Sequence, residues 1–206
     1  MSERDPASVD DSGEANEPLY WYKPALIGSP WVFRLKPDGL AWETGGRSGL
    51  IRYQRVRRVR LSFRPLTMQS YRFITEIWSD DAPKLQFAST TWRSLTDQGR
   101  QDADYREFVT ELHRRFSAAN ATAQFVAGIP LATFVVGVIV SAIAAAAFVG
   151  IAYRALEISE RGAAAVICGF LLIFGWQVGN YLYRNRPMIY RPDALPLQLM
   201  PRGERT

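Results

Sequence analysis

Residues 126–153 read VAGIPLATFVVGVIVSAIAAAAFVGIAY, and residues 162–183 read GAAAVICGFLLIFGWQVGNYLY. Neither stretch contains Asp, Glu, Lys, Arg or His. A helix needs about 20 predominantly apolar residues to cross the hydrocarbon core of a bilayer, and both stretches supply them. We therefore expect two transmembrane helices at 126–153 and 162–183, joined into a hairpin by the short loop 154–161.

Arginines at the outer ends of the two stretches predict the orientation of the hairpin. Five of them flank the pair: Arg114, Arg115, Arg184, Arg186 and Arg191. The loop 154–161 instead balances two arginines with two glutamates. Because Lys and Arg concentrate on the cytoplasmic side of a membrane, the N- and C-termini are both expected in the cytoplasm.

The remainder of the 206-residue chain is long enough for one further domain of about 100 residues. Residues 1–18 carry a net charge of −5 and almost no branched apolar residue, which predicts a disordered acidic tail. Residues 19–125 carry a net charge of +7, and we place a soluble domain at 19–120. Residues 184–206 form a Pro-rich basic C-terminal tail.

Alternation of apolar and polar residues predicts short strands in this domain. Val59, Leu61 and Phe63 alternate with basic residues and give the clearest half-buried strand. Other strand candidates share this pattern and are bounded by turn residues: 31–35, 40–44, 50–53, 71–77 and 85–87. A helix follows, because five apolar residues recur at helical spacing: Tyr105, Phe108, Val109, Leu112 and Phe116.

Three segments carry a resemblance to a known layout: IRYQRVRRVRLSFRP (51–65), STTWRS (89–94) and ADYREFVTELHRRF (103–116). Together with the two spans, they resemble small bacterial membrane proteins with an N-terminal domain of the pleckstrin-homology (PH) superfold. The resemblance implies an α+β fold: an antiparallel barrel or sandwich capped by one C-terminal helix, then a transmembrane hairpin. It also implies a bacterial inner membrane. The strand candidate 40–44 contains Glu43 and no base, which argues against inositol-lipid recognition.

Small residues in the two spans are candidates for helix packing. Gly137, Ser141 and Ala145 recur every four residues in the first span, and Gly175 and Gly179 form a G-x-x-x-G in the second. The simplest expectation is that these faces pack the two spans against each other. Formation of a homo-oligomer is the alternative.

Arginines around the clearest strand form the densest charge feature of the chain. Arg55, Arg58, Arg60 and Arg64 are the candidate residues for binding an anionic surface. Anionic lipid headgroups, an acidic protein and the acidic tail 1–18 all fit this charge, and a solvated strand face is the alternative. Nucleic acid is not expected, because no recognition motif accompanies the arginines.

Signatures of catalysis and of metal binding are missing from the sequence. It holds no G-x-S-x-G, no P-loop and no cluster of metal ligands, so we expect neither an enzyme nor a cofactor. The sole histidine, His113, stands among charges and is expected at the surface. The sole cysteine, Cys168, lies in the second span, where packing explains it.

The C-terminal tail combines prolines with apolar residues. Its prolines forbid a long helix or a central strand. We expect Leu195 to Leu199 to dock on the domain or on a partner, with disorder as the alternative. The whole pattern predicts a membrane-anchored, non-catalytic binding or scaffolding module, and the alternative is an accessory subunit of a membrane enzyme or transporter.

Overall fold

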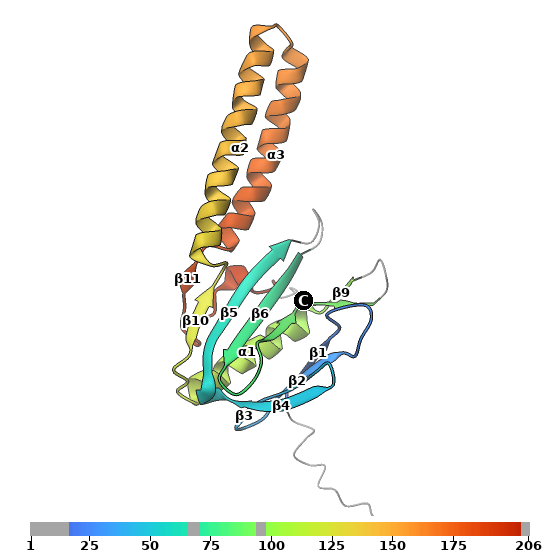
Figure 1. Ribbon diagram of the computed structural model, residues 1–206, viewed down its shortest axis with the longest axis vertical. Coiled ribbons are helices and arrows are strands. Elements are labelled where there is room, and N and C mark those ends of the chain that lie inside the picture. Colours follow the sequence, from blue (N-terminus) through green and yellow to red (C-terminus); the bar gives the residue numbers. More distant parts are fainter. Residues whose placement is uncertain (1–16, 66–70, 94–97, 203–206) are drawn as a thin grey trace, which may run out of the picture.

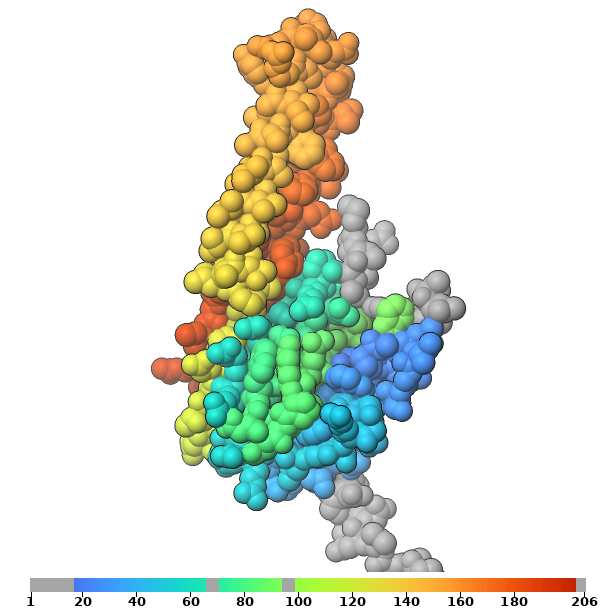
Figure 2. Space-filling model, in the orientation of Figure 1, coloured from blue at the N-terminus to red at the C-terminus, as the bar shows by residue number. Residues whose placement is uncertain are grey.

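The computed structural model describes residues 17–65, 71–93 and 98–202. Its fold is α+β: a strand-rich body carries one helix, and two long apolar helices project from it as a hairpin (Figure 1). Figure 2 shows the hairpin as a narrow column on a compact body. Most of the predicted acidic tail, residues 1–18, lies outside the described residues. Pro18 is an exception, since its carbonyl accepts a hydrogen bond from the Leu35 amide.

The first sheet is an antiparallel meander of four strands in chain order. These are β1 (Leu19–Tyr22), β2 (Trp31–Leu35), β3 (Gly39–Thr44) and β4 (Arg47–Arg52). Gly45 and Gly46 connect β3 to β4 with φ of +56° and +78°. A two-residue hairpin turn of type I′ needs positive φ at both central positions, which glycine adopts without steric cost.

The second sheet has the order β11-β10-β5-β6-β7. Its long central strands are β5 (Val56–Pro65) and β6 (Tyr71–Ser79), and β7 spans Leu85–Ala88. Two short strands from the flanks of the hairpin extend it: β10 (Gln124–Ala127), which runs parallel to β5, and β11 (Met188–Ile189). A separate pair consists of β8 (Thr90–Trp92) and β9 (Gln98–Arg100).

The helix α1 (Asp102–Ala118) covers the core. All five residues of its predicted stripe are at most 2% exposed, so this prediction is confirmed. Tyr105 donates to or accepts from the Thr75 hydroxyl on β6 at 2.7 Å, and Phe108 packs against Phe87 on β7 with ring centroids 5.5 Å apart. Tyr20 on β1 packs against both Phe87 and Phe108, and Phe33 on β2 packs against Phe87. Aromatic contacts thus join the two sheets and α1 in one core.

The hairpin consists of α2 (Leu131–Glu157) and α3 (Arg161–Arg184), which are long and apolar enough to cross a membrane. Their boundaries differ from the prediction. The expected first span began at residue 126, but Val126 and Ala127 belong to β10, because their backbones pair with Arg60 and Leu61 of β5. At the other end, α2 continues to Glu157 and leaves only residues 158–160 between the helices.

The segment after α3 returns to the body and enters its core. Tyr190, Leu199 and Met200 are buried there, and Arg106 on α1 donates a hydrogen bond to the Pro201 carbonyl at 3.0 Å. Leu195 packs partly buried against the core, whereas Leu197 is 75% exposed. The tail is therefore docked as far as Pro201, and the body extends beyond the predicted boundary at residue 120.

Candidate functional site

The direction in which β5 runs relative to the hairpin determines how far each predicted arginine lies from α2 and α3. Its parallel neighbour β10 leads into α2, and the pairs Gln124–Arg58 and Ala127–Leu61 fix the register. The C-terminal end of β5 therefore lies at the base of the hairpin (Figure 1). Arg64 lies at this basal end, while Arg55 precedes the strand at the opposite, distal end.

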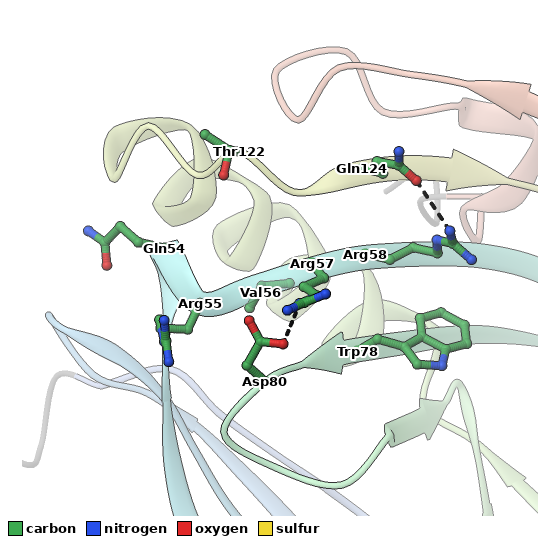
Figure 3. Close-up of a pocket in the computed structure, with 9 residues that line it drawn as sticks. All are labelled: Gln54, Arg55, Val56, Arg57, Arg58, Trp78, Asp80, Thr122 and Gln124. Carbon is green, nitrogen blue, oxygen red and sulfur yellow. Dashed lines mark hydrogen bonds and ion pairs between the residues drawn. The ribbon is translucent and has the colours of Figure 1, made fainter.

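The arginines at the distal end are paired with acids. Arg55 forms two hydrogen bonds to Asp81, at 3.1 and 3.2 Å, and Arg57 pairs with Asp80. Arg55, Arg57 and Asp80 line a shallow hollow of about 610 Å³ together with Thr122 (Figure 3). Both guanidinium groups are more than half exposed, so these ion pairs contribute little to stability. Their charge is nonetheless partly neutralised.

The two central arginines contact neighbouring strands. Arg58 donates to the Gln124 side chain at 3.3 Å, as Figure 3 shows. Arg60 lies 3.9 Å from Glu76 and 5.2 Å from the centroid of the Trp78 ring. Glu76 is 4% exposed and also pairs with Lys84, so it has a cation on two sides. These contacts give Arg60 a structural role on the surface of the sheet.

A different set of arginines gathers at the base of the hairpin. Arg64 lies directly opposite Arg72 of β6, a like-charge pair that is unfavourable on adjacent strands. Burial, and then repulsion from Arg64, lower the pKa of Arg72 below its usual value. The Arg72 Nε atom is buried and has no hydrogen-bond partner among the described residues.

The end of α3 brings two more arginines to this level. The guanidinium carbon of Arg184 lies 4.7 Å from the centroid of the Phe63 ring, and that of Arg186 lies 5.2 Å from the Tyr183 ring. We name Arg64, Arg72, Arg184 and Arg186 the basal arginines. Within the described ranges, no acid lies within 4.0 Å of any of the four.

A buried asparagine fixes the hairpin to β5. Asn185, directly after α3, is 0% exposed, and its Oδ1 accepts a hydrogen bond from the Phe63 amide at 3.0 Å. Its Nδ2 donates to the Phe63 carbonyl at 2.8 Å and to the Tyr181 carbonyl at 3.2 Å. The side chain thus continues the β5 ladder where β10 ends. The orientation of the hairpin relative to the sheet is set by this contact.

Gly128 completes the same junction on the side of α2. It has φ of +79°, and its amide donates to the Leu61 carbonyl at 2.8 Å. A Cβ atom here would collide with the carbonyl groups of Asn185 and Arg186. The Ile129 amide donates to the Asn185 carbonyl at 3.1 Å. Both ends of the hairpin are therefore joined to each other and to β5 by backbone contacts that only glycine permits.

The predicted helix-packing residues divide into two groups. Gly137, Ser141 and Ala145 on α2 are half-buried, and a Cβ atom at Gly137 would lie 3.8 Å from Leu182 of α3. By contrast, Gly175 and Gly179 on α3 are exposed, and a Cβ atom at either position would meet nothing within 4 Å. The G-x-x-x-G face of α3 is therefore open rather than packed on α2.

His113 is not at the surface, so that prediction is wrong. It is 0% exposed, and its Nδ1 lies 2.7 Å from the Val109 carbonyl. Because a carbonyl can only accept, Nδ1 carries the proton, and Nε2 accepts from the Tyr190 hydroxyl at 2.8 Å. Burial lowers the His113 pKa from 6.5 to about 4. The ring is a neutral link between α1 and the segment after α3.

Other reactive groups do not assemble into a site in the described residues. No group of three or more His, Cys, Asp or Glu side chains there could hold a metal ion. Cys168 is exposed on α3. Comparisons with protein-family models, with curated proteins and with solved structures gave no match.

Proposed function

We propose that the chain is a membrane-anchored binding or scaffolding module without catalytic activity. Its PH-like body lies at the cytoplasmic face of a bacterial inner membrane, and α2 and α3 cross the bilayer. The observation that carries this proposal is the junction at Asn185 and Gly128, which fixes the body to the hairpin at both ends. A body attached in this way presents one defined end to the lipid.

The surface of the hairpin supports insertion into a membrane. Large apolar side chains along it are mostly exposed, such as Val166 at 73%, Leu172 at 76% and Trp176 at 77%. Soluble monomers rarely expose contiguous apolar patches of more than a few hundred square ångströms, because water solvates them poorly. A bilayer removes this cost, since its hydrocarbon is as apolar as the side chains.

The arrangement of the body supports the PH-like assignment. The resemblance implies an antiparallel barrel or sandwich capped by one helix. The body agrees with it in having two antiparallel meanders, β1–β4 and β5–β7, followed by the short pair β8–β9 and by α1 over the core. The strands β10 and β11 add to that layout and connect it to the hairpin.

Thiol labelling tests the insertion and its orientation. In a Cys168→Ala background, Ser159→Cys between the helices should react with a membrane-impermeant maleimide in intact cells. Ser117→Cys, exposed on α1, should react only after lysis. The full chain should also remain in the membrane fraction at alkaline pH. Labelling of Ser117→Cys but not Ser159→Cys in intact cells would reverse the orientation, and alkaline extraction would contradict insertion.

The open face of α3 favours one alternative, an accessory subunit of a membrane enzyme or transporter. Gly175 and Gly179 leave room for a second helix to approach closely. Under this alternative, purification from membranes in mild detergent should recover a partner protein in fixed stoichiometry. Gly175→Leu with Gly179→Leu should release it, while Gly162→Leu, at an equally open helix position near the loop, should not. Recovery of the chain without a stoichiometric partner contradicts the alternative.

A further inference from the structure

The level of each arginine along β5 decides which of them can reach lipid. The side chain of Asn185, directly after α3, bonds the Phe63 backbone, so the next residue of β5, Arg64, lies at the level of the end of α3. Arg184 and Arg186 follow at the end of α3. Each headgroup layer outside the hydrocarbon core is about 5–7 Å thick. The four basal arginines therefore lie within the layer that surrounds the base of an inserted hairpin.

The remaining arginines of β5 lie further from this layer than Arg64. A strand rises about 3.3 Å per residue, so the backbones of Arg60 and Arg58 lie about 13 Å and about 20 Å further from the hairpin, measured along β5, than the backbone of Arg64. Arg55 lies further still and is bound to Asp81. Distance and pairing thus remove the distal arginines, Arg55 and Arg57, from direct contact with headgroups. The central arginines, Arg58 and Arg60, lie between the two groups and line a hollow that reaches Pro130 and Leu131 at the start of α2.

From these observations we propose that the basal arginines bind the phosphate groups of anionic lipids around the hairpin. This inference rests on the proposed membrane insertion. The guanidinium group presents several N–H donors to phosphate oxygens, often in pairs. Arg64 and Arg72 repel each other in the protein alone, and a phosphate between them would remove that repulsion.

The apolar surroundings of the basal arginines suit a lipid rather than a free anion. Arg184 stacks on Phe63 and Arg186 on Tyr183, so both guanidinium groups border aromatic side chains. Tyr183 is 60% exposed at the end of a helix whose surface is mostly apolar. Aromatic residues at this level are typical of membrane–water interfaces. The acyl chains of a bound lipid would lie along the hairpin.

Spin-labelled lipids test this inference on the full chain. The protein is reconstituted in phosphatidylcholine bilayers containing spin-labelled phosphatidylglycerol or spin-labelled phosphatidylcholine. Electron paramagnetic resonance then gives the fraction of each label immobilised by the protein. We expect phosphatidylglycerol to be preferred, and the preference to fall at least about fivefold when all four basal arginines become Gln. High salt should also weaken it.

A matched variant tests whether position or total charge decides the preference. Replacing Arg52, Arg55, Arg57 and Arg114 by Gln removes the same charge from the distal part of the body and should leave the preference unchanged. Equal loss in both variants would overturn the inference, as would no loss in the basal variant. Loss of the preference in inorganic phosphate, but not in chloride at equal ionic strength, would reassign the site to a soluble anion.

The proposed insertion and this lipid site fail in distinguishable ways. A chain that does not incorporate into the bilayers contradicts both. A chain that incorporates and resists alkaline extraction, but immobilises the two labelled lipids equally, contradicts the lipid site alone.

Discussion

Replacing Asn185 by alanine is expected to lower the free energy of unfolding of the body by roughly 2–6 kcal/mol. The substitution leaves the Phe63 amide and carbonyl without partners at a position that is fully buried. Each buried polar group without a partner costs about 1–3 kcal/mol, because it has lost its hydrogen bonds to water. Urea unfolding of the full chain in mild detergent, followed by tryptophan fluorescence, measures the change.

Two further variants separate the hydrogen bonds from the remaining effects of the substitution. Asn180→Ala removes an exposed asparagine five residues earlier, whose contact is with Arg184 at 3.3 Å, and should change the free energy by less than about 1 kcal/mol. Asn185→Asp keeps the acceptor for the Phe63 amide but places a carboxylate against the Phe63 carbonyl, and it should be as harmful as alanine. A wild-type unfolding midpoint for Asn185→Ala would contradict this account of the junction.

The elements that the sequence predicts well are those with a long, regular pattern. Two uncharged runs predict the hairpin because about 20 apolar residues in a helix match the thickness of the hydrocarbon core. The stripe on α1 repeats over three turns, and the alternation in β5 extends from Val59 to Phe63. Each of these signals depends only on neighbouring residues in the chain.

The elements that the sequence misses depend on contacts between distant segments. The strands β10 and β11 have four and two residues, too few for a period to be visible. They form because the hairpin returns the chain to the edge of β5. Asn185 likewise has no local signature, since its partner Phe63 is 122 residues away.

The burial of His113 could have been predicted from its position on the helix. It follows Val109 by four residues and precedes Phe116 by three, which places it on the buried face of α1. The two arginines after it in the sequence obscured this periodicity.

The pairing of the arginines, by contrast, could not be predicted from the local sequence. The acids that pair with Arg55, Arg57 and Arg60 come from another strand, β6, and from the turn after it.

The burial of His113 also predicts how stability depends on pH. An unfolded histidine has a pKa of 6.5, but burial lowers the pKa of His113 to about 4 in the folded chain. Between these values the unfolded chain binds a proton that the folded chain does not bind. The free energy of unfolding is therefore highest above pH 6.5 and falls as the pH decreases towards 4, by roughly 2 kcal/mol between pH 7 and 5.

A variant without the imidazole isolates this effect, because His113 is the only histidine in the sequence. His113→Gln keeps a hydrogen-bonding side chain but has no proton to gain, so its free energy of unfolding should be lower at pH 7 and nearly flat down to pH 5. The difference between the wild type and His113→Gln should shrink by roughly 2 kcal/mol over that window. Glu111, whose pKa its hydrogen bond with Arg114 lowers, is present in both proteins, so its contribution cancels in the difference. Parallel pH profiles for the two proteins would show that the His113 ring is already accessible to protons in the folded chain.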